Sequence, residues 1–374
     1  MAIIVKNFQT TDAPAWDAYV YAHPHATLYH LSGWRNIILK TYGHKVCYLM
    51  AVDSPASKIR NSANHVVGIL PLVHIKHYFF GNSLISIPFF DLGGILADNE
   101  KIEQVLLLEA IRLGQELKVK TIELRHEKPL KWFDFSDFQK TIQNSNLETK
   151  DLVLQTRLHK VRMPLDLLGS SEVLMKHFKP RLRTKIRKSL KEDLRSEIGG
   201  VELLNDFYQV FSTNMRDLGS PVHSKKLMRY VLEEFPMIAR IVMIYRRSQP
   251  IACSLVIGFG DSLESPWVSS IRKYTRLSPN ILLYWTMMEY ARDSGFASFE
   301  FGRSSPGEGT YRFKQQWGAR PVQLCWHNIS FDNLRETEEK SERSKFEKAI
   351  QCWKKLPVPV TKIIGPMIRK YIGL

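Results

Sequence analysis

The residue types best suited to chemistry lie between Phe299 and Gly318, in the segment FEFGRSSPGEGTYRFKQQWG. A short predicted strand ends there at Gly302, and a turn rich in glycine, serine and proline comes after it. Glycine lets a backbone approach a ligand, and loops at strand ends commonly carry function. Arg303 and Lys314 are cations that could stabilise charge developing on an attacked carbonyl, with Tyr311 beside them. A tight turn closed by aromatic side chains explains the segment equally well.

A second segment, RKYTRLSPNI at 272–281, suits phosphate binding. Ser278 can cap a helix predicted over 280–294, and Pro279 fits its first turn. Amides and the partial positive charge at a helix N-terminus attract phosphate. The candidate residues are Arg272, Lys273, Arg276, Ser278, Asn280 and Ile281. On this segment alone, an ordinary capped helix with a solvated basic approach is the favoured interpretation.

A third segment, KPRLRTKIRKSLKEDLR at 179–195, has a leucine or isoleucine at every fourth position from Leu182 to Leu194 and carries eight Lys or Arg. This pattern predicts a helix with one apolar face and basic residues around the rest. Arg183 and Arg187 are candidates for contact with an anionic acceptor. A solvated helix packed through its leucines is an equal alternative.

The elements that must position these residues alternate between strands and helices along all 374 residues, which indicates an α/β protein. A polar stretch near 131–150 separates two halves with the same order of elements. The predicted domains are 1–150 and 151–330, followed by 331–374 as a charged linker and basic amphipathic tail.

Composition favours an anionic partner, since 53 basic and 37 acidic residues give a formal charge of +16. The four cysteines are too scattered for a disulfide framework, and no histidine spacing predicts a metal site. The N-terminus does not resemble a signal peptide, and no apolar run reaches the ~20 residues of a spanning helix. We expect a cytoplasmic protein. The tail at 345–374 mixes basic and apolar residues, so it either contacts the anionic inner face of the cell membrane or packs over the second domain.

The segment at 299–318 resembles the "DFGRS…GTY.FK..WG" signature of FemAB-related proteins, especially those associated with exosortase and exopolysaccharide gene clusters. MRDLGSPV at 215–222, PFFDLGG at 88–94, IELR at 122–125 and WKKLPVP at 353–359 are similar to further family motifs. The chain therefore resembles the FemAB-like branch of the GNAT superfamily over nearly its whole length.

This resemblance implies two tandem GNAT-like domains, each a mixed, mostly antiparallel sheet flanked by helices. It implies a donor pyrophosphate at 272–281 and direct transfer without a covalent enzyme intermediate. Lys314 corresponds to a family lysine near the transferred acyl group. Asp91 is the candidate acid of the first domain, although the family turn there is only partly matched. Arg216 joins Arg183 and Arg187 as a candidate for acceptor or anion binding.

The leading hypothesis is an N-acyltransferase without a metal. Its donor is acyl-CoA or aminoacyl-tRNA, and its acceptor is a small or lipid-linked amine, in exopolysaccharide or cell-envelope biosynthesis. The rival is a non-catalytic protein that binds membrane or nucleic acid and organises a polysaccharide assembly complex. The sequence leaves the donor, the acceptor and the oligomeric state open.

Overall fold

The computed structural model describes residues 2–54, 65–131, 152–331 and 339–373. The chain divides into two compact units. The first unit comprises 1–159, 323–335 and 371–374, and the second comprises 160–322 and 336–370. The predicted boundary at 150 lies outside the described residues.

The first unit is built on an eight-stranded sheet in the order β1-β2-β3-β4-β6-β16-β7, with β5 paired to β3. Its strands are β1 Ala2–Asn7, β2 Lys45–Ser54, β3 His65–His77, β4 Gly81–Ser86, β5 Leu96–Ala97, β6 Thr121–His126, β7 Val153–Arg157 and β16 Cys325–Ser330. Every pairing is antiparallel except that of β4 with β6.

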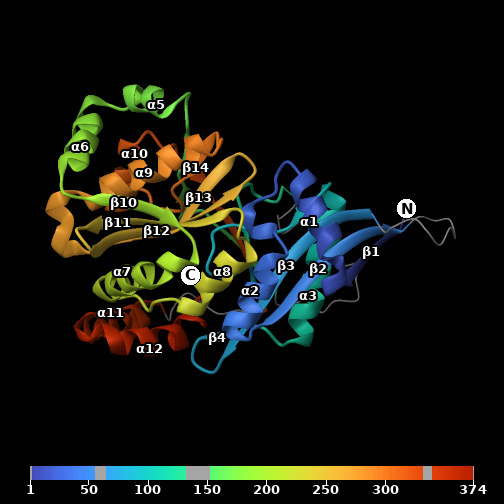
Figure 1. Cartoon of the computed structure of the whole chain (residues 1–374). Coiled ribbons are helices and arrows are strands. Elements are labelled where there is room, and N and C mark those ends of the chain that lie inside the picture. Colours follow the sequence, from blue (N-terminus) through green and yellow to red (C-terminus); the bar gives the residue numbers. More distant parts are fainter. Residues whose placement is uncertain (1, 55–64, 132–151, 332–338, 374) are drawn as a thin grey trace. The chain divides into compact units, whose positions relative to one another are not determined.

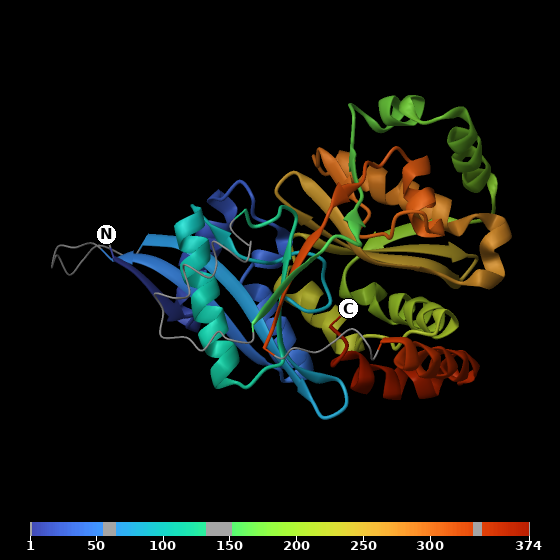
Figure 2. The ribbon, with the colours of Figure 1, turned by 180° about the vertical axis from the view of Figure 1, so that it is seen from behind.

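Successive side chains of β2 point to opposite faces of the sheet, so β2 contacts helices on both faces. Leu49 and Ala51 join the core beneath α3 (Glu100–Glu116). Tyr48 points to the other face and stacks on Trp16 of α1 (Ala13–Ala22), with ring centroids 5.2 Å apart. Helix α2 (Gly33–Tyr42) ends at Gly43, whose φ of 68° provides the left-handed stop. Figures 1 and 2 show α3 on one side of the strands and α1 and α2 on the other.

The second unit has a six-stranded sheet in the order β10-β11-β12-β13-β14-β9. Its strands are β9 Pro164–Asp166, β10 Arg195–Gly199, β11 Ala239–Arg246, β12 Gln249–Phe259, β13 Ser262–Ser270 and β14 Ser298–Glu300. The pairing of β13 with β14 is parallel, and the other neighbours in this sheet are antiparallel. Two further strands, β8 Val161–Arg162 and β15 Val322–Gln323, pair with each other as a separate two-stranded sheet.

Helices flank the second sheet as well. They are α5 Ser171–His177, α6 Pro180–Lys191, α7 Leu204–Leu218, α8 Lys225–Glu234, α9 Pro279–Asp293, α10 Gly309–Gln316, α11 Glu339–Lys355 and α12 Val358–Arg369. Helix α9 lies on one face of the sheet and α7 on the other (Figure 1). The prediction of two mixed, mostly antiparallel sheets flanked by helices is confirmed.

Three local predictions need correction. The last strand, β16, is predicted in the second domain but pairs with β6 and β7 of the first sheet, because strand partners are not encoded in local sequence. The helix predicted over 179–195 ends at Lys191, and Arg195 already belongs to β10. Part of the predicted charged linker is helical, because α11 begins at Glu339, before the tail at 345–374, and α12 follows it.

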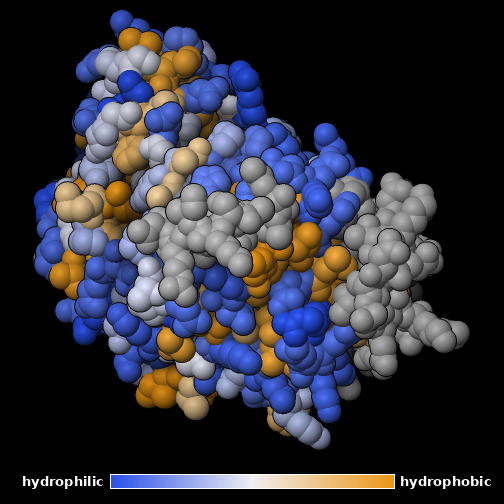
Figure 3. All heavy atoms as spheres, turned by 90° about the vertical axis from the view of Figure 1, so that its right-hand side faces the viewer, coloured by the Kyte–Doolittle hydropathy of each residue, from blue (hydrophilic) through white to orange (hydrophobic). Residues whose placement is uncertain are grey.

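No described helix is long and apolar enough to cross a membrane. On the side of the molecule drawn in Figure 3, hydrophilic side chains make up most of the coloured surface, and apolar ones gather in small patches between them.

Candidate active site

The parallel strands β13 and β14 pair over three residues and then part. Ser262, Leu263 and Glu264 face Ser298, Phe299 and Glu300 in register. Beyond them, the hydroxyl of Ser265 donates to the carbonyl of Glu300 at 3.0 Å. The register of β12 against β13 shifts at the same place, as a β-bulge does, so β13 turns away and runs on to Ser270.

Lys314 holds the turn that comes after β14. Its Nζ donates to the carbonyl oxygens of Gly302 at 2.9 Å and Arg303 at 2.7 Å, and its side chain is buried. Gly302 has a φ of 74°, and a Cβ there would lie 4.0 Å from the carbonyl oxygen of Ser265. The turn and the lysine ammonium are therefore beside the point where β13 and β14 separate.

Glu300 is a buried carboxylate in this turn and is absent from the residues predicted for the site. Its Oε1 accepts from the amides of Met163 at 3.0 Å and Gly302 at 2.9 Å, and its Oε2 lies 3.3 Å from Nε of Arg162. Burial raises the pKa of Glu300, while Arg162, the two amides and Lys314 oppose that rise. A lone acid between two phenylalanines of a predicted strand is the signal that could have found it.

Aromatic side chains close the same turn from the core side. Tyr284 of α9 lies 5.1 Å from Phe301 and 5.2 Å from Phe313, measured between ring centroids. Trp317 is fully buried, and Tyr311 packs against this cluster. The expected aromatic closure is thus present together with the two cations. Arg303 is half-buried where the turn begins.

The start of α9 follows β13 through the short 3-10 helix Arg272–Leu277. Pro279 occupies the first turn of α9 as predicted, but Ser278 does not cap it. Ser278 has a φ of 56° and a ψ of 43°, a left-handed conformation in which its hydroxyl makes no cap hydrogen bond. The amide of Ile281 donates to the carbonyl of Ser278 at 2.9 Å, so this amide is already engaged.

Electrostatics favour an anion at this helix start. Arg272, Lys273, Arg276 and Asn280 are all exposed or half-exposed, and the first turn of α9 carries no acid. Lys273 lies over the ring of Tyr274, with its Nζ 5.8 Å from the centroid. Three cations at the surface thus precede a helix N-terminus, where backbone amides add further positive potential.

The basic residues expected on the acceptor side are divided between two places in the second unit. Arg183 and Arg187 lie one turn apart on α6, which packs through Leu182 and Ile186. Leu190 is 53% exposed and Ser189 is buried instead, because a spacing of four drifts away from the helical period of 3.6. Arg216 pairs with Asp217 and donates to the carbonyl of Leu356, so it ties α7 to the segment between α11 and α12.

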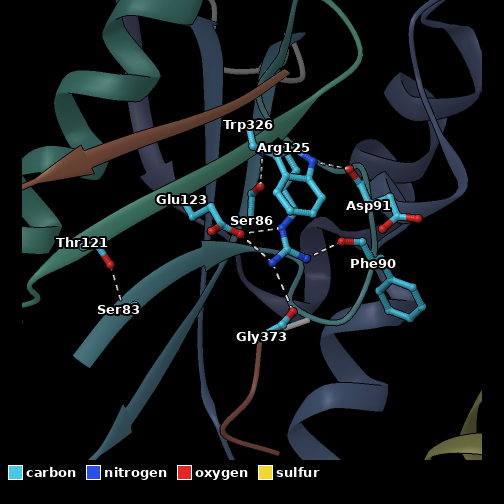
Figure 4. Close-up of polar contacts among 9 residues, drawn as sticks. All are labelled: Ser83, Ser86, Phe90, Asp91, Thr121, Glu123, Arg125, Trp326 and Gly373. Atoms are coloured by element: carbon cyan, nitrogen blue, oxygen red, sulfur yellow. Dashed lines mark hydrogen bonds and ion pairs between the residues drawn. The ribbon is translucent and has the colours of Figure 1, made fainter. Parts of the chain in front are cut away.

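Asp91, the acid predicted for the first unit, lies in the loop after β4. Its backbone oxygen accepts from Nε1 of Trp326 at 3.1 Å, and its carboxylate points away from the contacts drawn in Figure 4. The polar centre there is Arg125, which is 1% exposed and lies over Trp326 with its Cζ 4.9 Å from the ring centroid.

Arg125 connects its own strand, β6, with β4, with the loop after β4 and with the segment at Gly373 (Figure 4). Its guanidinium pairs with Glu123 and donates to the carbonyls of Phe90 and Gly373, and its amide donates to Ser86 Oγ at 2.9 Å. The strand that carries Arg125 matches a family motif in sequence, but nothing in that motif predicts these contacts.

The tail packs on the second unit and leaves one side uncovered. Gly365 of α12 has no room for a Cβ, which would lie 3.0 Å from the backbone nitrogen of Val222. Nε of Arg369 donates to His223 at 3.0 Å. Ile363 and Met367 are 70% and 63% exposed. Both sequence interpretations of the tail therefore have a structural counterpart.

Among the described residues, no group of three or more His, Cys, Asp or Glu side chains could hold a metal ion. The free cysteines Cys47, Cys253 and Cys325 are buried, and Cys352 is exposed. The candidate site of the second unit consists of the point where β13 and β14 part, the turn after β14 that Lys314 holds, and the basic helix start that follows β13.

Comparison with known proteins relates part of the second unit to a protein family. Residues 176–315, from the end of α5 to α10, match the acetyltransferase (GNAT) domain. No curated protein matches the chain.

Among solved structures, FemX has 14% sequence identity and a TM-score of 0.62, over 87% of this chain and 97% of its own. The C-terminal domain of a putative lysylphosphatidylglycerol synthetase from Agrobacterium fabrum has 10% identity and a TM-score of 0.54, over 89% and 94%. A tandem GNAT protein from the clavulanic acid biosynthesis pathway has 9% identity and a TM-score of 0.52, over 88% and 98%. Residues 176–315 of the second unit thus match a GNAT acetyltransferase domain, and the chain as a whole shares its fold with FemX and with the tandem GNAT protein.

Proposed function

We propose that the second unit transfers an acyl or aminoacyl group from a phosphate-bearing donor, acyl-CoA or aminoacyl-tRNA, to an amine. One observation carries the proposal: of two parallel strands that part, β13 leads into a basic, uncapped helix start and β14 leads into a turn held by a buried lysine. The phosphates of the donor would lie against Arg272, Lys273 and Arg276. Its reactive carbonyl would lie near Gly302 and Arg303.

Transfer needs no residue that forms a covalent intermediate. The acceptor nitrogen attacks the donor carbonyl carbon, and a C–N bond forms. The C–S bond of a thioester, or the C–O bond of an aminoacyl ester, breaks, and a proton leaves the nitrogen and ends on the departing sulfur or oxygen. Holding donor and acceptor in line supplies much of the acceleration in such reactions.

Lys314 is a positioning residue in this proposal. Two of its three N–H donors bond the carbonyls of Gly302 and Arg303, so it fixes the turn rather than attacking the donor. Arg303 is the candidate to stabilise negative charge on the attacked carbonyl oxygen, and Tyr311 is the neighbouring hydroxyl. Glu300 joins them because it holds the amide of Gly302 from the other side. Asp91 remains the candidate acid of the first unit, and no step of this mechanism is assigned to it.

The acceptor follows from the resemblance to FemAB-related proteins rather than from a contact. It would be a small or lipid-linked amine of exopolysaccharide or cell-envelope biosynthesis. Arg183 and Arg187 would meet an anionic group on the acceptor or on a tRNA donor, because neither guanidinium pairs with a carboxylate among the described residues. Arg216 is the weaker candidate because it is bonded within the fold.

A calorimetric titration with acetyl-CoA, a longer acyl-CoA and free CoA tests the donor site, with aminoacyl-tRNA measured in parallel by filter binding. We expect saturable binding of one donor class, and a loss of about ten- to a hundredfold in affinity in Lys273→Ala/Arg276→Ala, because charge-assisted phosphate contacts are the strong ones. Lys101→Ala, which removes an exposed cation from the first turn of α3, is the matched control.

Each outcome of the titration decides between named alternatives. Binding of CoA but not tRNA would assign a small thioester donor. Binding of tRNA alone would assign an aminoacyl ester, and its affinity would fall steeply with salt. Binding of neither would favour the non-catalytic alternative.

A further inference from the structure

The hairpin between β3 and β4 in the first unit ends in three consecutive aromatic residues that the fold does not cover. Tyr78 is 93% exposed, Phe79 81% and Phe80 44%. We call these three residues the aromatic tip. The hairpin loop extends away from the rest of its sheet in both ribbon views (Figures 1 and 2). Exposed aromatic residues are costly in water unless they meet a partner.

The aromatic tip is held in place rather than loosely displayed. Nδ1 of His77 accepts from the amides of Phe79 at 3.1 Å and Phe80 at 3.3 Å. The ring of His77 lies 4.9 Å from Phe80 and 4.2 Å from Tyr371, between centroids. Gly81, with a φ of 95°, closes the turn. A turn that is already ordered loses little conformational entropy when it binds.

Four exposed lysines lie near the base of the aromatic tip, and we call them the lysine collar: Lys45, Lys76, Lys118 and Lys120. Asn82 links three of them. It faces Lys76 in the register of β3 and β4, its side chain donates to the carbonyl of Lys118 at 2.7 Å, and its own carbonyl accepts from the amide of Lys120 at 2.8 Å. Lys45 faces His74 on the neighbouring strand pair.

The charge around the aromatic tip is one-sided. No acidic residue occurs between His65 and Phe90. The nearby Glu116 pairs with Arg112, and none of the four collar lysines forms an ion pair with a described carboxylate. Aromatic rings beneath a belt of lysines match a membrane interface, where the rings enter the headgroup region and the ammonium groups meet lipid phosphates.

We propose that the aromatic tip of the first unit inserts into the surface of an anionic bilayer, with the lysine collar against the lipid phosphates. The aromatic tip belongs to the first unit and the proposed donor site to the second, and a test of the tip does not require activity. It would hold the enzyme at the place where a lipid-linked acceptor resides. An anionic bilayer is favoured over a protein partner because the collar supplies charge without a shaped pocket.

Co-sedimentation of the full chain with vesicles tests the proposal. We expect binding to vesicles of phosphatidylcholine with phosphatidylglycerol, weak binding to phosphatidylcholine alone, and weakening when salt is raised to ~0.5 M. Tyr78→Ser/Phe79→Ser should reduce the apparent affinity by about tenfold or more, because the rings supply the apolar area that enters the interface. Lys76→Gln should reduce it roughly fivefold, since each basic residue near an anionic surface contributes ~1 kcal/mol.

Tyr21→Ser is the matched control, because Tyr21 is 65% exposed on α1 of the same unit, and it should bind like the unchanged protein. Ile363→Ser/Met367→Ser tests the tail separately. Vesicle binding that the tip variants leave intact overturns the proposal, even if the tail variant abolishes it. Absence of any binding to anionic vesicles overturns it as well. If the double variant fails to fold, Phe79→Ser alone gives the same test.

Discussion

The two units contain the same strand arrangement and differ in how the chain continues beyond it. In the first unit, β4 and β6 pair in parallel over Ser83–Ile85, and the hydroxyl of Ser86 then accepts from the amide of Arg125. In the second, β13 and β14 pair in parallel over Ser262–Glu264, and the hydroxyl of Ser265 donates across the pair. Each pair is three residues long and ends at a serine that bridges the two strands.

Beyond Ser86, an ion pair and hydrogen bonds among residues of the first unit occupy the end of its parallel strand pair. The guanidinium of Arg125 is bonded to Glu123 and to the carbonyls of Phe90 and Gly373 (Figure 4). In the second unit the strands diverge into a turn that Lys314 fixes, and β13 continues to Ser270, past the paired segment.

The helix between the two parallel strands also differs between the units: α3 in the first and α9 in the second. The side chain of Asn99 caps α3 by accepting from the amide of Ile102 at 3.2 Å, and the first turn carries Glu100 and Glu103. The start of α9 has neither a side-chain cap nor an acid. Acids at a helix start repel an anion, and cations before it attract one. Of the two helix starts, that of α9 is therefore the more favourable for an anion.

The largest expected effect tests whether Arg125 closes the first unit. Arg125→Met should lower the free energy of unfolding by about 3–5 kcal/mol, because it leaves Glu123 and two buried carbonyls without their cation. Chemical denaturation measures the loss, and a donor titration at low temperature should give an unchanged affinity. Lys40→Met, an exposed cation of the same unit, should cost little. A folded Arg125→Met protein that has lost donor affinity would instead put a ligand in the first unit.

Acid should weaken the first unit more than the second. Burial lowers the pKa of His30 to about 4 and that of His327 to about 4. Burial also lowers the pKa of His126 well below its usual value. Between a pH of about 6.5 and 4, these histidines bind protons in the unfolded chain but not in the folded unit. Stability therefore falls as the pH drops through this range. His30 and His327 together should cost about 3 kcal/mol at a pH of about 5.5.

The second unit has opposing groups. Burial lowers the pKa of His223, but burial raises that of Glu300. A raised carboxyl pKa means that the folded state holds its proton more tightly, so this contribution favours folding as the pH falls. Hydrogen exchange of peptides from each unit at a pH of about 7.5 and of about 5.5 measures the difference. Earlier loss of protection in the second unit would contradict it.

Lys314→Met tests whether the turn after β14 in the second unit takes part in acyl transfer. The turn at Gly302 and Arg303 would lose its two hydrogen bonds to Nζ, so transfer should slow by about a hundredfold, while donor affinity changes by less than about threefold. Arg312→Met removes an exposed cation from the same helix and is the matched control. A folded Lys314→Met protein with full activity would remove the lysine from the mechanism.

Helix starts and ends could be predicted from the residues close to them in sequence. Gly43 stops α2, Pro279 starts α9, and α3 has apolar residues at helical spacing, so each of these elements is encoded within a few neighbouring residues. The same locality explains an error. Ser278 looks like a helix cap in sequence, and only its left-handed backbone shows that its hydroxyl does not act as one.

The parts that sequence did not reveal depend on distant residues. Arg125 bonds to Gly373, 248 positions away, and Glu300 meets Met163, 137 positions away. β16 joins the first sheet although it comes after the second in the chain. A single sequence contains no periodicity that pairs such residues, so the closed first unit could be identified only from the structure.

The smallest expected effect compares the two helix starts directly. Asn99→Ala removes a cap hydrogen bond and should cost the first unit about 1 kcal/mol. Ser278→Ala removes a hydroxyl that caps nothing and should change stability by less than about 0.5 kcal/mol, since alanine gains no cap and inherits the same left-handed strain. Thermal unfolding of the two variants gives both numbers. If Ser278→Ala keeps its stability but loses about tenfold in donor affinity, the hydroxyl binds the donor phosphate. The uncapped start of α9 is then a ligand site rather than an irregular helix end.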